Sequence, residues 1–174
     1  MKLGLNPEGK DIVRIETKVM GDGGYYHVYL YARKLPEDFF EIISVPHQGY
    51  EACAGDIVEA EYGKREGKDA DVWVLKDVVQ RKTRPVSFMY GGNVFVVPKA
   101  YDRVALHTMS TVGRILKGNG IVSDMAYPNV LDVAMPLNAN RKVFTEMVLS
   151  VCTKCGSTQT EVYFWDDPVA EVAW

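Results

Sequence analysis

The sequence predicts a mainly β (α+β) fold, in which a five-stranded barrel is followed by a β-rich extension with one helix and a cysteine-tipped hairpin. Three observations predict it. Polar and apolar residues alternate with a period of two through the first half of the chain, as in half-buried strands. Glycine-rich or charged turns separate the alternating segments. In the second half, residues 101–116 carry apolar side chains at helical spacing.

Composition places the chain among ordinary globular proteins. Its 174 residues are 47% hydrophobic and 25% charged, which excludes a disordered, collagen-like or disulfide-rich chain. The net charge of −3 argues against a protein held on duplex DNA by a large basic field. The odd, small number of cysteines, three, argues against a secreted disulfide framework. The start of the sequence does not resemble a signal peptide and no apolar run reaches about 20 residues, so we expect no membrane partner. We expect the protein in the cytoplasm, a host's if it is viral, or in a virion.

Five strands fit between residues 11 and 80. In the first, Val13 and Ile15 share one face while Arg14 and Glu16 share the other. The glycine-rich residues 21–24 then supply a hairpin turn. The expected strands are residues 12–19, 25–33, 39–45, 56–62 and 70–79. A basic break at residues 81–85 marks the expected boundary between two units, residues 1–85 and 86–174.

The second unit is predicted to combine hairpins with a helix. Gly91 and Gly92 separate two short apolar runs, which is a hairpin signal. Gly118 is placed to cap the helix. We expect strands at residues 86–90, 93–97 and 129–135, the helix at 101–116, and a last hairpin formed by residues 143–151 and 160–165.

The second predicted strand carries a row of aromatic side chains on one face. Alternation places Tyr25, His27, Tyr29, Tyr31 and Arg33 together. Bases of single-stranded nucleic acid stack on such rings, at about 1–3 kcal/mol per base, and an arginine can add a stacking or phosphate contact. The alternative is that these tyrosines lie under a second packing layer or at a subunit interface, where tyrosine is also enriched.

Cys152 and Cys155 form a Cys-x-x-Cys motif followed by glycine. At the tip of a hairpin, two such thiolates could bind one zinc ion, but a closed structural site needs four ligands. His47 and Cys53 are the first candidates to complete it. The alternatives are a metal-free turn with two reduced thiols, or a redox dithiol. Zinc is therefore the one cofactor that the sequence suggests.

Sequence motifs of catalysis are missing from the chain. It contains neither a Gly-x-x-x-x-Gly-Lys-[Ser/Thr] phosphate loop nor a Gly-x-Ser-x-Gly nucleophile elbow. The three histidines stand apart from any plausible nucleophile in a known spacing. We therefore expect a protein that is not an enzyme.

Residues 11–80 resemble an OB-fold, a five-stranded barrel. The resemblance is carried by residues 55–62, which open on Gly55-Asp56, by the charged loop that follows, and by residues 72–79. Small single-strand-binding proteins of phages resemble this plan. The resemblance implies oligonucleotide binding across strands 2 and 3 and the flanking loops. It adds the loop cations Lys64, Arg65 and Lys68 to the aromatic face.

Three functional hypotheses follow. The first is a non-catalytic protein that binds single-stranded DNA through the aromatic face and the basic loop. The second is a virion structural or assembly protein, such as a decoration, tail or head-completion component. The third is a small metal-stabilised regulator or inhibitor built around Cys152 and Cys155. The expected partners are single-stranded nucleic acid, further copies of the chain, and replication or virion proteins of a phage or its host.

Overall fold

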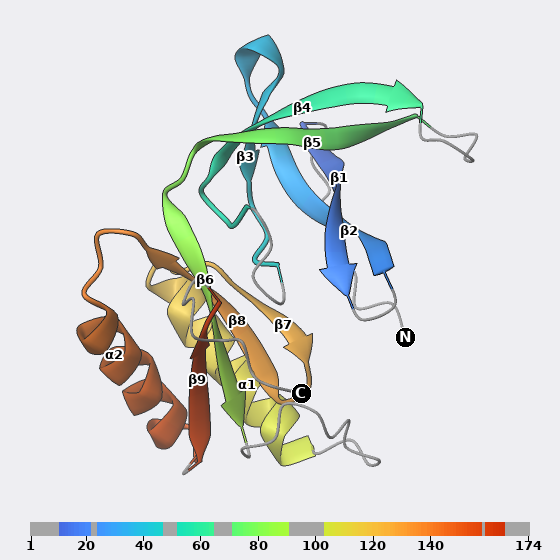
Figure 1. Ribbon diagram of the computed structural model, residues 1–174. Coiled ribbons are helices and arrows are strands. Elements are labelled where there is room, and N and C mark those ends of the chain that lie inside the picture. The colour runs from blue at the N-terminus through green and yellow to red at the C-terminus, as the bar shows by residue number, and fades with distance from the viewer. Residues whose placement is uncertain are drawn as a thin grey trace.

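The first part of the chain forms a closed barrel of five strands (Figure 1). The computed structural model describes residues 11–21, 24–46, 52–64, 71–90, 103–157 and 159–165. The barrel strands are β1 (Ile12–Gly21), β2 (Gly24–Lys34), β3 (Phe39–Ile42), β4 (Ile57–Lys64) and β5 (Asp71–Gln80), and a single 3-10 turn, η1 (Pro36–Asp38), connects β2 to β3. All five predicted strands are confirmed, although β3 ends three residues earlier than expected.

The barrel strands follow one another in sequence order. Each pairs antiparallel with the next, and β5 closes the barrel by pairing parallel with β1, where Ile15 lies opposite Trp73. An OB-fold is a Greek-key barrel, so this meander differs in strand order from the fold that the sequence resembles. Inside, Leu30, Phe40 and Val58 are fully buried with Ile15, as the period of two predicts.

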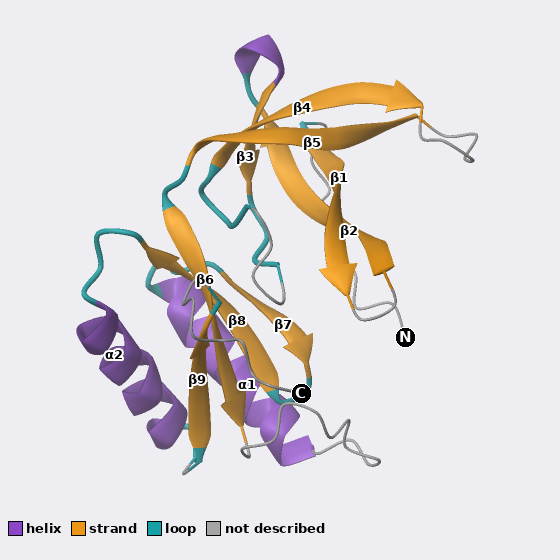
Figure 2. Ribbon diagram, viewed as in Figure 1, coloured by secondary structure: helices purple, strands orange, loops and turns teal. Residues whose placement is uncertain are grey.

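The second part is a four-stranded antiparallel sheet with two helices on one face (Figure 2). The sheet has the order β7-β8-β6-β9. Its elements are β6 (Thr83–Tyr90), α1 (Arg103–Gly118), β7 (Ser123–Tyr127), β8 (Val130–Pro136), α2 (Arg141–Lys154) and β9 (Thr160–Phe164). Phe88 and Leu131 from the sheet pack against Met109 of α1 and Val148 of α2. Of the helices in the described residues, none has the length and apolar content to cross a membrane.

The predicted cysteine-tipped hairpin is wrong, because residues 143–151 belong to the helix α2. Asn140 caps this helix, its side chain accepting a hydrogen bond from the Val143 N–H at 3.2 Å. Phe144, Val148 and Cys152 recur every four residues and are buried against the sheet. That buried stripe at helical spacing outweighs the modest helix propensity of the β-branched residues in this segment. The second part therefore has two helices rather than one.

The other predictions for the second part had mixed outcomes. The helix at 101–116 and the strands at 129–135 and 160–165 are confirmed as α1, β8 and β9. Strand β7 was not predicted, and residues 93–97 lie outside the described residues. Strand β6 begins before Pro85, which the sequence placed in a break. Pro85 is tolerated because β9 pairs with β6 only from Val86 onward.

A buried carboxylate joins the two parts where β5 leads into β6. Asp56 is fully buried and accepts hydrogen bonds from the backbone N–H groups of Cys53, Lys82 and Thr83, at 3.0, 2.7 and 3.1 Å. The Thr83 hydroxyl donates back to the Ala54 carbonyl oxygen at 2.7 Å. The loop before β4 is thereby fixed to the connection between barrel and sheet.

A second contact between barrel and sheet involves the carboxyl group of Asp124, whose charge depends on pH. The Val45 N–H, just after β3, donates to Asp124 of β7 at 2.8 Å. Burial raises the pKa of the Asp124 carboxyl, and Asp132 on the neighbouring strand adds to the rise, while the Val45 hydrogen bond and Lys117 of α1 oppose it. Compared with the unfolded chain, the native state therefore shifts Asp124 toward its protonated form.

We expect Asp124→Asn to stabilise the protein at neutral pH. A raised native pKa means that the stability contributed by this group is present at low pH and is lost as pH rises through the native pKa. Asparagine keeps an oxygen acceptor for the Val45 N–H and carries no charge. Urea unfolding should give a higher midpoint for the variant at neutral pH, with a difference that shrinks toward about pH 4. A lower midpoint at neutral pH would contradict this account.

Candidate nucleic-acid interface

The outward face of the β1–β2 hairpin carries most of the predicted aromatic row. The register places Tyr29 opposite Glu16 and Tyr31 opposite Arg14. Leu30 and Ala32 point the other way and are buried in the barrel. The side chains at alternate positions of β2 therefore do share a face, and β1 supplies the residues beside them.

Among the described side chains of the row, Tyr29 is the exposed ring. It is 38% exposed, and the guanidinium carbon of Arg14 lies over its ring at 4.3 Å from the centroid. Arg14 is itself exposed. A guanidinium stacked on a tyrosine is held in a fixed orientation, and its N–H groups stay available to a phosphate at the edge of the stack. Arg14 was not among the site residues predicted from the sequence. The antiparallel pairing of the first two strands places it beside the aromatic row of β2.

Glu16 lies on the same face but is only 2% exposed. The sequence pattern placed it on the solvent side with Arg14 and Lys18. In the structure its Oε1 contacts Nδ1 of His27, the next outward residue along β2 from Tyr29. A carboxylate buried beneath this face presents little negative charge to a ligand outside. Among the described side chains of the hairpin face, the exposed charges are then cations: Arg14, Lys18 and Arg33.

The other predicted residues contribute less to this face. Tyr31 is half-buried, and its N–H donates to the Ser44 hydroxyl at 3.0 Å. Arg33 forms an ion pair with Glu41 of β3 at 3.1 Å. Arg65 and Lys68, and the side chains of Tyr25 and Lys64, lie outside the described residues.

A second group of aromatic side chains lies where β2, β4 and β5 meet. Tyr62 of β4 and Trp73 of β5 are cross-strand partners, with ring centroids 5.0 Å apart. The Lys34 ammonium lies 4.8 Å from the centroid of the Trp73 ring. Phe40 packs its ring against Trp73 from the core, with centroids 4.7 Å apart. We call Lys34, Tyr62 and Trp73 the barrel-end cluster. The alternation of residues along β2 alone does not reveal it, because its two aromatic rings lie on β4 and β5.

Comparison with known proteins shows the fold and nothing further. No family model matches the chain, and no curated protein matches it. A solved structure, that of a hypothetical protein from Neisseria gonorrhoeae, is similar with a TM-score of 0.52 and 13% sequence identity. The similarity covers 87% of this chain and 92% of that one. The arrangement of barrel and helix-backed sheet therefore occurs in another protein.

The fold separates Cys53 from Cys152. Cys152 is buried among the side chains between helices and sheet, whereas Cys53 is buried between barrel and sheet with Val45 and Ala134. Burial raises the pKa of Cys152 to about 11 and that of Cys53 to about 12, so both are protonated thiols at neutral pH. Cys155 caps α2.

A zinc site would need these thiols as thiolates. In the described ranges, no three His, Cys, Asp or Glu side chains gather as metal ligands. His47, the fourth residue of the predicted set, lies outside those ranges.

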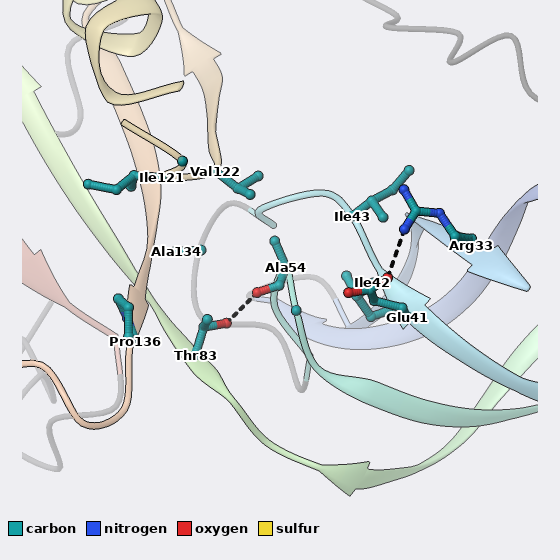
Figure 3. A pocket seen from close by; sticks show the side chains of 12 residues that line it. Arg33, Glu41, Ile42, Ile43, Ala54, Thr83, Ile121, Val122, Ala134 and Pro136 are labelled. Carbon is teal, nitrogen blue, oxygen red and sulfur yellow. Dashed lines mark hydrogen bonds and ion pairs between the residues drawn. The ribbon is translucent and has the colours of Figure 1, made fainter. Parts of the chain in front are cut away.

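A groove of about 450 Å³ runs between the barrel and the sheet. Figure 3 shows Ile42 and Ile43 on the barrel side of the groove and Val122 on the side of the sheet, with Ile121 next to it; Ile121 and Val122 precede β7. The Arg33–Glu41 ion pair lies at its edge. The lining is mostly apolar, and its polar side chains already have partners: Arg33 pairs with Glu41, and the Thr83 hydroxyl donates to the Ala54 carbonyl oxygen.

Proposed function

We propose that the protein binds single-stranded nucleic acid, DNA in the first instance, on the outward face of the β1–β2 hairpin. The observation that carries the proposal is the exposed Tyr29 ring beneath the Arg14 guanidinium. The ring offers an apolar surface to a base, and the guanidinium offers hydrogen bonds to the adjoining phosphate. Lys18 extends the positive charge along the same face.

The small net charge of the chain is compatible with this function. Non-sequence-specific binding of single strands combines stacking with a local cationic track, and burial of Glu16 removes an acid from that track. The predicted loop cations Arg65 and Lys68 would add to it. The proposal rests on these side chains, because the meander barrel differs from the Greek-key OB barrel.

We expect Tyr29→Ala to weaken the binding of a fluorescent oligothymidylate by about 5- to 150-fold, or about 1–3 kcal/mol. Fluorescence anisotropy across a salt series measures the affinity. Arg14→Gln should also reduce the salt dependence by about one counterion. Tyr127→Ala is the matched control, since Tyr127 is an exposed tyrosine of the other sheet. Absence of binding at low salt, or an unchanged affinity for Tyr29→Ala, would overturn the proposal.

A second candidate, an assembly protein such as a virion component, is favoured by one surface. Val143 and Met147 lie one helical turn apart on α2 and are 63% and 41% exposed. Exposed apolar side chains at this spacing suit a contact with another protein chain. Light scattering on the same preparations distinguishes the two candidates: a defined oligomer with no oligonucleotide affinity would favour assembly.

A further inference from the structure

We infer that the barrel-end cluster of Lys34, Tyr62 and Trp73 is a second binding site, one for a single nucleobase with its 5′-phosphate. The inference rests on the proposed function, since it assigns another contact of the same kind of ligand. It is distinct in place. The outward face of β1–β2 carries Tyr29, whereas Trp73 pairs with Ile15, whose side chain points into the barrel.

The rings of the cluster are arranged to accept a flat ligand. Tyr62 is 56% exposed, and its ring plane is tilted by 53° from that of Trp73. Rings tilted in this way do not cover each other face to face, so an exposed face of Tyr62 is free for stacking. Phe40 meets Trp73 at an interplanar angle of 60° from within the core and fixes the indole in place. A base stacking here would therefore meet a rigid support.

The charge of the cluster fits a phosphate. The Lys34 ammonium lies over the Trp73 ring and forms an ion pair with Asp38 of η1 at 3.2 Å. Both partners of that pair are well exposed, and exposed pairs of this kind are worth little. An ammonium has three donors, so Lys34 can bind a phosphate oxygen beside the stacked base while it keeps the contact to Asp38.

The outward surface of strands β4 and β5 contrasts with the barrel-end cluster in charge. On the outward side of β4–β5, Lys76 forms ion pairs with Glu59 and Glu61, at 3.3 and 3.9 Å. Two carboxylates around one ammonium would repel a phosphate. Lys34 and Lys76 have nearly equal side-chain exposure, 46% and 49%. Lys34 and Lys76 therefore allow a matched comparison: Lys34 lies beside an aromatic ring, and Lys76 is surrounded by carboxylates.

The fluorescence of Trp73 reports on the site directly. We expect thymidine monophosphate and an oligothymidylate, titrated separately, to quench the tryptophan fluorescence of the full chain. Trp73→Phe should abolish the quenching. Tyr62→Ala and Lys34→Gln should each raise the half-quenching concentration by about 5-fold or more, and their controls Tyr127→Ala and Lys76→Gln should leave it unchanged. Quenching by the monophosphate assigns a free nucleotide, and quenching by the oligothymidylate alone assigns a base of a strand.

The failure of this inference can be told apart from failure of the proposed function. If the oligothymidylate binds and Tyr29→Ala weakens it, yet Trp73 is not quenched by either ligand, the barrel-end site is refuted and the hairpin face stands. Quenching that persists in both Tyr62→Ala and Lys34→Gln also refutes it. If Trp73 is quenched in the Tyr62- and Lys34-dependent manner but Tyr29→Ala has no effect, the barrel-end site stands and the hairpin face is refuted.

Discussion

Asp56→Ala should lower the free energy of unfolding by about 3 kcal/mol or more. Its carboxylate is fully buried and accepts three backbone N–H groups, from Cys53, Lys82 and Thr83. A hydrogen bond to a charged acceptor contributes about 1.5–3 kcal/mol, and each buried donor left without a partner costs about 1–3 kcal/mol. Alanine removes all three acceptor contacts at once. Urea unfolding at neutral pH measures the loss.

Two further variants separate the hydrogen bonds from the general effect of losing a carboxylate. Asp77→Ala removes an exposed aspartate whose one partner in the described part of the chain is the neighbouring Val78 N–H, at 2.8 Å, and should change stability by no more than about 0.5 kcal/mol. Asp56→Asn keeps one acceptor oxygen and should fall between Asp56→Ala and the wild type. A loss below about 1 kcal/mol for Asp56→Ala would show that Asp56 does not fasten barrel to sheet.

The Gly55-Asp56 motif has a local structural role in this protein. The Gly55-Asp56 pair carried the resemblance to OB-folds, and the structure gives a local reason for both residues. Gly55 has a φ of +96°, in the left-handed region that favours glycine. Asp56 then reaches residues 82 and 83, which lie far along the chain. The motif therefore marks a turn and a fastening point, while strand order is decided elsewhere.

The barrel strands could be predicted because one face of each is buried. Ile15, Leu30 and Val58 sit in the core while their sequence neighbours point outward, and a period of two records that difference. The helix α2 could not be predicted in this way. Its sequence fits the period of two of a strand as well as the spacing of a helix. The Asn140 cap and the Phe144–Val148–Cys152 spacing stabilise a helix here because those three side chains pack against the sheet.

The candidate site was predicted in part, for the same reason. Alternation on one strand placed Tyr29 and His27 on a common outward face, but a single strand says nothing of its neighbours. The Arg14 stack on Tyr29 and the Glu16–His27 contact depend on the register of β1 with β2. The barrel-end cluster depends on three strands, so pairing information was needed to bring Lys34 to Trp73.

Phe88→Ala should cost about 3–5 kcal/mol of stability. Phe88 is fully buried at the centre of the sheet and belongs to the core that both helices cover. Removing its ring leaves a cavity, and the cost includes both the lost burial and the unfilled space, because β8 and β9 hold β6 on both sides. The helical far-UV circular dichroism signal, followed through a urea titration, measures the loss.

Phe88→Ala also tests whether oligonucleotide binding depends on the barrel and not on the helix-backed sheet. The barrel has a separate core around Phe40 and carries both proposed binding surfaces, whereas the helices belong to the other core. We therefore expect folded Phe88→Ala to keep the oligothymidylate affinity of the wild type despite its lower stability. Val143→Ala, on the exposed face of α2, is the control and should shift stability by no more than about 0.5 kcal/mol. Loss of affinity in folded Phe88→Ala would place part of the binding surface on the sheet.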